Sequence, residues 1–139
     1  MTKLAIQTGG AQEHLGVEGA YRLIKDCGFD GVDANIDILF PYENMKNQII
    51  PPLFTASEPE FLEAFRPWKE GAKKYGLENY QAHAPFPSMY SWGEAPEYNK
   101  KLLESLQRTI RACDFIDCRR VVIHPFFRTY EARTTDAEE

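Results

Sequence analysis

Two histidines stand at matching places in this sequence, each at the end of a short apolar run and shortly before proline. His83 lies in "YQAHAPFP" and His124 lies in "VVIHPFF". A neutral imidazole can ligate zinc or manganese, and it can exchange hydrogen bonds with sugar hydroxyls. Two imidazoles alone do not complete a metal site, which needs at least one further ligand. The pattern therefore favours the wall of a binding pocket over a metal site, and histidines bonded only to backbone are the plain alternative.

A second polar group follows another extended run. Asp33, Asn35 and Asp37 alternate with apolar residues in "GVDANID", and Gln7 stands near the end of the first apolar run. Such side chains could bind substrate hydroxyls or support the ligands of a metal. Short polar side chains also cap turns, and this alternative stays equally open. His14, near Gly9-Gly10, is expected to be a solvated loop residue.

Aromatic side chains gather in the proline-bearing segments after these runs. Phe86 and Trp92 follow His83, and we count both as candidate substrate-binding residues because aromatic faces stack on sugar rings. Phe40, Tyr42 and Phe126 could extend the same wall. Aromatic residues in such loops also simply pack the loop against the protein, which is the alternative interpretation.

The elements that must position these residues alternate regularly along the chain. Helical signals include a capping box at Ser57 and Glu60, glycines that end helices at Gly28 and Gly76, and Pro67, which predicts a kink or break. Apolar stripes at spacings of three and four predict helices, and buried apolar runs predict strands. We expect strands at 3–9, 29–36, 78–84 and 120–124, helices at 17–27, 57–75 and 96–115, and a long loop at 37–56.

This order predicts an α/β fold with parallel strands and right-handed crossovers. Either an open four-stranded sheet or part of a β/α barrel would fit it. The first strand is expected to be buried, and the fourth to be buried on both faces because of its β-branched residues. Cys27 and Cys113 fall on helical apolar stripes and are expected to be small buried hydrophobic residues. The stripe of the last helix is Leu102, Leu106, Ile110 and Cys113.

Composition narrows the classes of function. The chain has 139 residues, is 43% hydrophobic and 27% charged, and carries a net charge of −5. This length predicts one domain, and the acidic balance argues against nucleic acid as a partner. No apolar run approaches the length of a membrane span, so no membrane is expected as a partner. The start "MTKLAIQTGG" lacks the pattern of a signal peptide, which favours the cytoplasm.

Three segments together resemble the xylose-isomerase-like barrels, a family that includes sugar isomerases, sugar epimerases and the apurinic endonuclease IV group. They are "GVEGAYRLIKDCGFDGVDANID", "FLEAFRPWKEGAKKYGLENYQAHAPF" and "NKKLLESLQRTIRACDFIDCRRVVIHPFF". The resemblance covers about residues 3–127 and implies a (β/α)₈ barrel, which takes about 250 residues when complete. This chain therefore corresponds to the N-terminal half of such a barrel, followed by a polar tail at about 128–139.

The resemblance also implies a site. His83 and His124 match histidines that end the third and fourth strands and that ligate a metal in the endonuclease-like branch. In the sugar-enzyme branch, the equivalent positions line the substrate pocket. The family implies a divalent metal (Mn, Zn, Mg or Co), but most of its metal ligands and its catalytic glutamates come from the second half of the barrel. Asp33, Asn35, Gln7, Phe86 and Trp92 remain the other candidate substrate-binding residues.

Three functions follow as expectations. The first is a sugar or sugar-phosphate isomerase or epimerase that moves a proton with the help of a metal, and that is incomplete as an isolated chain. The second is a metal-dependent abasic-site nuclease, and the third is a non-catalytic half-barrel. Open sheet edges favour self-association, and a homodimer could rebuild an eight-stranded barrel with two-fold symmetry.

Overall fold

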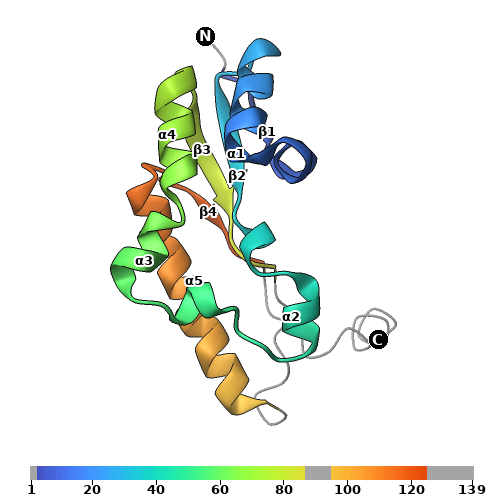
Figure 1. The fold of residues 1–139 in the computed structure, drawn as a ribbon, viewed down its shortest axis with the longest axis vertical. Coiled ribbons are helices and arrows are strands. Elements are labelled where there is room, and N and C mark those ends of the chain that lie inside the picture. Colours follow the sequence, from blue (N-terminus) through green and yellow to red (C-terminus); the bar gives the residue numbers. More distant parts are fainter. Residues whose placement is uncertain (1–2, 87–94, 125–139) are drawn as a thin grey trace, which may run out of the picture.

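The computed structural model of the protein describes residues 3–86 and 95–124, in which the strands form one parallel sheet. Its order is β1-β2-β3-β4, so each strand pairs with its neighbour in sequence. A sequential order with parallel pairing is the topology of consecutive βα units in half of a (β/α)₈ barrel, and the predicted fold class is confirmed. The strands are β1 (Ala5–Gln7), β2 (Gly31–Asn35), β3 (Glu78–His83) and β4 (Val121–Val122) (Figure 1).

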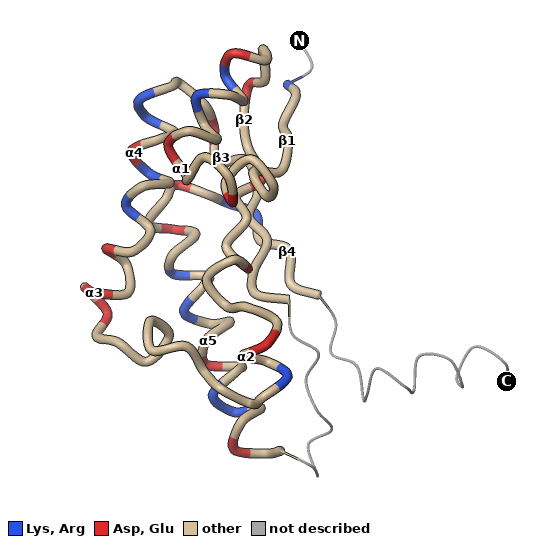
Figure 2. Tube along the Cα trace, turned by 45° about the vertical axis from the view of Figure 1, so that its right-hand side comes forward, with Lys and Arg blue, Asp and Glu red and all other residues tan. Residues whose placement is uncertain are grey.

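The main helices lie on one side of the sheet, as Figure 2 shows for α1, α3, α4 and α5 beside the strands. Right-handed crossovers between sequential parallel strands place their helices on the same face, which explains this one-sided layer. The predicted loop 37–56 contains three short helical turns instead of irregular chain. The helices are α1 (Gly9–Asp26), α2 (Tyr42–Lys46), α3 (Glu58–Glu63), α4 (Arg66–Tyr75) and α5 (Pro96–Phe115), with 3₁₀ turns at Asp37–Leu39 and Pro52–Thr55.

Most local helix signals are confirmed. Ser57 and Glu60 form the capping box that starts α3, and the backbone N–H of Ser57 donates to Glu60 Oε2 over 3.1 Å. Pro67 lies in the first turn of α4, so the predicted long helix breaks into α3 and α4. Gly28 and Gly76 have φ values of 85° and 61°, the left-handed conformation that ends a helix at little cost for glycine.

The first helix begins earlier than its apolar stripe predicts. It starts at Gly9 and bends at Gly16, where φ is 68°, so it is two helical segments joined at a kink. His14 therefore lies on α1 and not in a loop, although it is exposed as expected. A glycine pair after a strand indicates a turn, but here the backbone turns directly into the helix.

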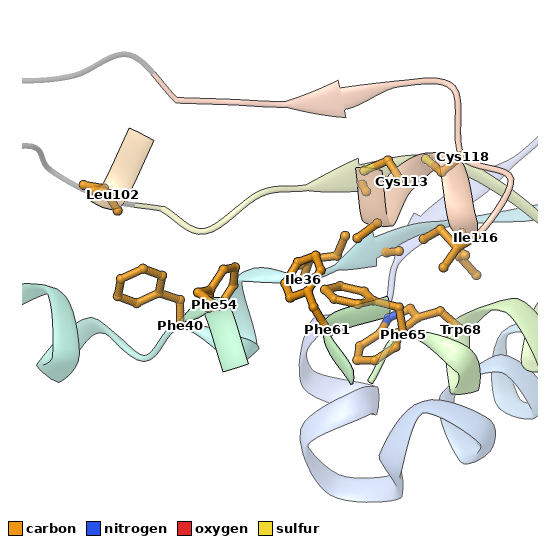
Figure 3. Packing of buried hydrophobic residues seen from close by; sticks show 14 of the residues in the cluster. Ile36, Phe40, Phe54, Phe61, Phe65, Trp68, Leu102, Cys113, Ile116 and Cys118 are labelled. Carbon is orange, nitrogen blue, oxygen red and sulfur yellow. The ribbon is translucent and has the colours of Figure 1, made fainter. Parts of the chain in front are cut away.

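The core between the helices and the sheet is built around a row of aromatic rings. Phe40, Phe54, Phe61, Phe65 and Trp68 follow one another with centroids 5.0–5.7 Å apart (Figure 3). Tilted rings at these separations are favourable beyond the area that they bury. The row joins the loop region to α3 and α4, so it holds the segment 37–56 against the rest of the domain.

Four expectations about burial are wrong, and three of them share a physical reason. The side chains of β1 are exposed, those of β4 are only partly buried, and Ile110 of α5 is 51% exposed. These residues belong to the outermost elements of the sheet and its helical layer, beside which the described chain places no further element. Cys27 is also exposed, because it caps the end of α1, whereas Cys113 is buried as expected.

Charge and membrane propensity agree with the composition. Lysine, arginine, aspartate and glutamate alternate along the helices, while the strands carry few charges (Figure 2). Among the described residues, no helix is both long enough and apolar enough to cross a membrane. The predicted polar tail lies outside the described residues.

Candidate active site

The face of the sheet opposite the helices carries a row of polar side chains. The register places Gln7 beside Asp33, and Asp33 beside Gln81. One row further toward the carboxyl ends, Asn35 stands beside His83. Paired positions of parallel strands present their side chains on the same face, so the predicted polar residues of three strands come together here.

Asp33 and His83 form the central pair of this site. The Nδ1–H of His83 donates to the Asp33 carboxylate, 3.0 Å from Oδ1 and 2.9 Å from Oδ2. Gln81 Nε2 donates to Asp33 Oδ2 over 2.9 Å, so the carboxylate is held from two directions. With Nδ1 engaged as a donor, Nε2 is the ring nitrogen that remains to accept a proton or bind a ligand.

A buried hydrogen-bond network fixes the end of β2 beside this pair. The backbone N–H of Asn35 donates to Thr8 Oγ over 2.9 Å, and its carbonyl accepts from Gln12 Nε2 over 3.2 Å. Thr8 Oγ in turn donates to Gln12 Oε1 over 2.8 Å. The start of α1 therefore positions the strand end from which Asn35 projects.

His124 and Phe86 complete the described part of the site. The His83 and His124 rings are stacked with centroids 5.6 Å apart, and Phe86 meets His124 edge-on at 4.4 Å. The two histidines that the sequence singles out are thus neighbours. Trp92 and Phe126 lie outside the described residues.

A cavity of about 380 Å³ opens next to the end of β2, and Phe86, which contacts the His124 ring, forms part of its wall. Asn35 and Asp37 line it together with Glu13, Phe86 and an apolar wall that includes Phe40 and Tyr42. Burial raises the pKa of the Asp37 carboxyl, and the nearby His83 and His124 oppose that rise. Pockets for small molecules commonly have this volume and this mixture of apolar wall and few polar groups.

Sequence reasoning missed three residues that act here by positioning others. Gln81 stands two residues before His83 on the same face of β3, and this i, i+2 spacing was a usable signal. Thr8 and Gln12 are spaced four apart at the start of α1, a helical spacing that local rules do not connect to a partner on β2. Nothing in their local sequence points to Asn35.

The described residues do not by themselves fit a metal ion. Among residues 3–86 and 95–124, no group of three or more histidine, cysteine, aspartate or glutamate side chains is arranged to hold one. His83 and His124 supply two imidazoles, but the Asp33 carboxylate is already held by His83 and Gln81. The divalent metal stays a prediction, and the geometry describes a hydrogen-bonded pair of a histidine and a carboxylate.

Comparison with known proteins adds no assignment. No family model, no curated protein and no solved structure matches this chain. The resemblance to xylose-isomerase-like barrels therefore remains a prediction from the residues.

Proposed function

We propose that this chain binds a sugar at the carboxyl end of its sheet and transfers a proton on it, as an isomerase or epimerase does. The observation that carries the proposal is the hydrogen-bonded pair of Asp33 and His83 at that edge. Active sites of β/α barrels lie at the same end of the strands. A histidine oriented by a carboxylate is a common general base near neutral pH.

In the proposed step, His83 Nε2 takes the proton from the carbon next to a substrate carbonyl. An enediolate and an imidazolium form, and Asp33 stabilises the imidazolium through the Nδ1–H hydrogen bond. The imidazolium then returns the proton to the neighbouring carbon while the hydroxyl proton passes between the two substrate oxygens, which gives the isomer. Epimerisation at the same carbon requires a second acid on its opposite face. No step is assigned to a metal ion.

Exchange of a substrate C–H proton for deuterium from the solvent tests this step even when the product is not known. The full chain is incubated in D₂O with a panel of aldoses and ketoses, and deuterium at the carbon next to the carbonyl is followed by NMR. We expect His83→Ala and Asp33→Asn to lower the exchange rate by about 10²-fold or more. His14→Ala is the matched control, since it removes an exposed histidine of α1 outside the site. Equal exchange in the His83→Ala variant, or none in the wild type, would overturn the proposal.

Self-association is a second candidate property, favoured by where the exposed apolar residues lie. All the exposed large apolar residues of the described chain except Tyr42, Ile49 and Tyr80 belong to its first and last strand–helix units. Those units hold the unpaired edges of β1 and β4, and open edges with apolar flanks drive association. The residues are Leu4, Ile6, Leu15, Leu23, Leu103, Ile110 and Ile123.

In the proposed dimer, β4 of each copy pairs with β1 of the other and the two half-barrels close with two-fold symmetry. Light scattering during size-exclusion chromatography should give the mass of a dimer. Ile6→Lys and Ile110→Lys should shift it to monomer, while Tyr42→Lys, which charges an exposed residue away from both edges, should not. A monomeric wild type would contradict the dimer.

The abasic-site nuclease also remains a prediction. The pair His83 and His124 is its support, and cleavage of a duplex that contains one abasic site tests it. The net charge of −5 weighs against binding to a phosphate backbone.

A further inference from the structure

The cavity next to the end of β2 contains two buried hydrogen-bond acceptors that lack partners among the described residues. Asn35 lines the cavity, is 8% exposed, and its Oδ1 has no hydrogen-bond partner among the described residues. Asp37 Oδ1, on the same cavity, is likewise buried without one, while the carboxyl as a whole accepts a hydrogen bond from the Ile38 backbone. Buried acceptors that stay unpaired are costly, and a ligand that donates hydrogen bonds would remove that cost.

The charge on the cavity wall is of one sign. The charged residues that line it are Glu13 and Asp37, and no lysine, arginine or histidine is among the described lining residues. The helix α2 beside this wall carries Glu43 in its first turn and Lys46 in its last, and the two histidines near Asp37 do not line the cavity, so the charge of the lining itself comes from the two carboxylates. A phosphate ester would bring negative charge toward carboxylates in a partly desolvated site, where like charges repel strongly.

The remaining wall suits the carbon skeleton of a sugar. The apolar side chains of Phe40, Tyr42, Met45 and Phe86 line the same cavity as the acceptor oxygens. A sugar ring presents C–H groups on its faces and hydroxyl donors at its rim, which matches this combination.

We infer that the cavity lined by Asn35 and Asp37 binds a sugar or polyol that carries no phosphate, with its hydroxyls donating to the unpaired oxygens of these two residues. This inference rests on the proposed function for the location of the site and goes beyond it by excluding sugar phosphates. Asn35 and Asp37 are specificity residues here, and His83 is not required for binding.

Binding of matched pairs of ligands tests the inference. The full chain is titrated calorimetrically with D-fructose and fructose 6-phosphate, and with D-xylulose and xylulose 5-phosphate. We expect each neutral sugar to bind at least about tenfold more tightly than its phosphate ester. In Asp37→Asn, which keeps an acceptor oxygen and removes the charge, that ratio should shrink several-fold. Asn35→Val should weaken the neutral sugars by about two- to tenfold.

The outcomes separate the inference about sugar binding from the proposed proton transfer. Tighter or equal binding of the phosphate esters overturns the inference, and so does the absence of binding by every neutral sugar at millimolar concentration. If the ratio of affinities for the neutral sugar and its phosphate ester is unchanged in Asp37→Asn, the ligand does not bind in this cavity. Circular dichroism of each variant confirms that the fold is retained. Binding that persists in His83→Ala, without proton exchange in the wild type, supports the cavity and refutes the proposed catalysis.

Discussion

The two faces of the sheet make opposite use of the same strands. On β2, Val32 and Ala34 face the helical layer and are fully buried, while Asp33 between them faces the other way and bonds to His83. The strand period of two thus separates residues that hold the fold together from residues available for chemistry. Substitutions one position apart on a strand should therefore differ strongly in how much stability they cost and in whether they affect the candidate site.

The largest contrast is expected between an aromatic residue of the core and one of the open face. Phe61 is 0% exposed and touches two rings of the aromatic row, whereas Tyr80 is 39% exposed and stacks with Arg120. Phe61→Ala should lower the free energy of unfolding by about 3–5 kcal/mol because it leaves a cavity. Tyr80→Ala should cost about 1 kcal/mol or less. Urea unfolding followed by circular dichroism measures both, and equal losses would remove the distinction between the faces.

Two polar residues of β3, one on each face of the sheet, should differ less in the free energy of unfolding that their substitution costs. Asn79 faces the helices, accepts a hydrogen bond from the Tyr21 hydroxyl and donates to the Ile116 carbonyl over 2.8 Å. Asn79→Ala leaves both buried groups without this partner and should cost about 2–3 kcal/mol. Gln81→Ala, on the open face, should cost about 1 kcal/mol or less, because water can replace its hydrogen bond.

A double variant separates the hydrogen bond from the loss of packing. Tyr21→Phe should cost less in the Asn79→Ala background than in the wild type, since the hydroxyl has already lost its partner. Strictly additive costs of the two substitutions would show that the pair does not act as a unit.

The smallest expected effect is the pH dependence of stability that comes from the Asp37 carboxyl. Burial raises the pKa of Asp37 in the folded protein. The stability linked to this group is therefore complete below its unfolded pKa of about 3.9 and is lost as the pH rises through its folded pKa. Asp37→Asn should be more stable relative to wild type at about pH 7 than at about pH 3. The check is the difference between the two proteins in urea unfolding at each pH, and a difference of constant size would contradict it.

How much of this protein is predictable from sequence depends on the range of the interaction involved. The capping box at Ser57, the break at Pro67 and the bounds of α5 all follow from neighbours within one or two helical turns. Burial of β1 and Ile110 was wrongly predicted, because an apolar pattern shows which face prefers burial and not whether another element covers it. Cys27 is exposed for a different reason, because it caps the end of α1.

The sequence by itself determined the alternation of strands and helices and the positions of His83, His124 and Asp33 at or near strand ends. These depend on side-chain periodicity and helix signals, which are local. The tertiary structure decided which of these residues meet. The register of β2 and β3 shifts between Val32 and Asp33, so that Asp33 stands beside Gln81 and its carboxylate reaches His83. Strand register depends on packing of the whole sheet against its helices, which no short stretch of sequence encodes.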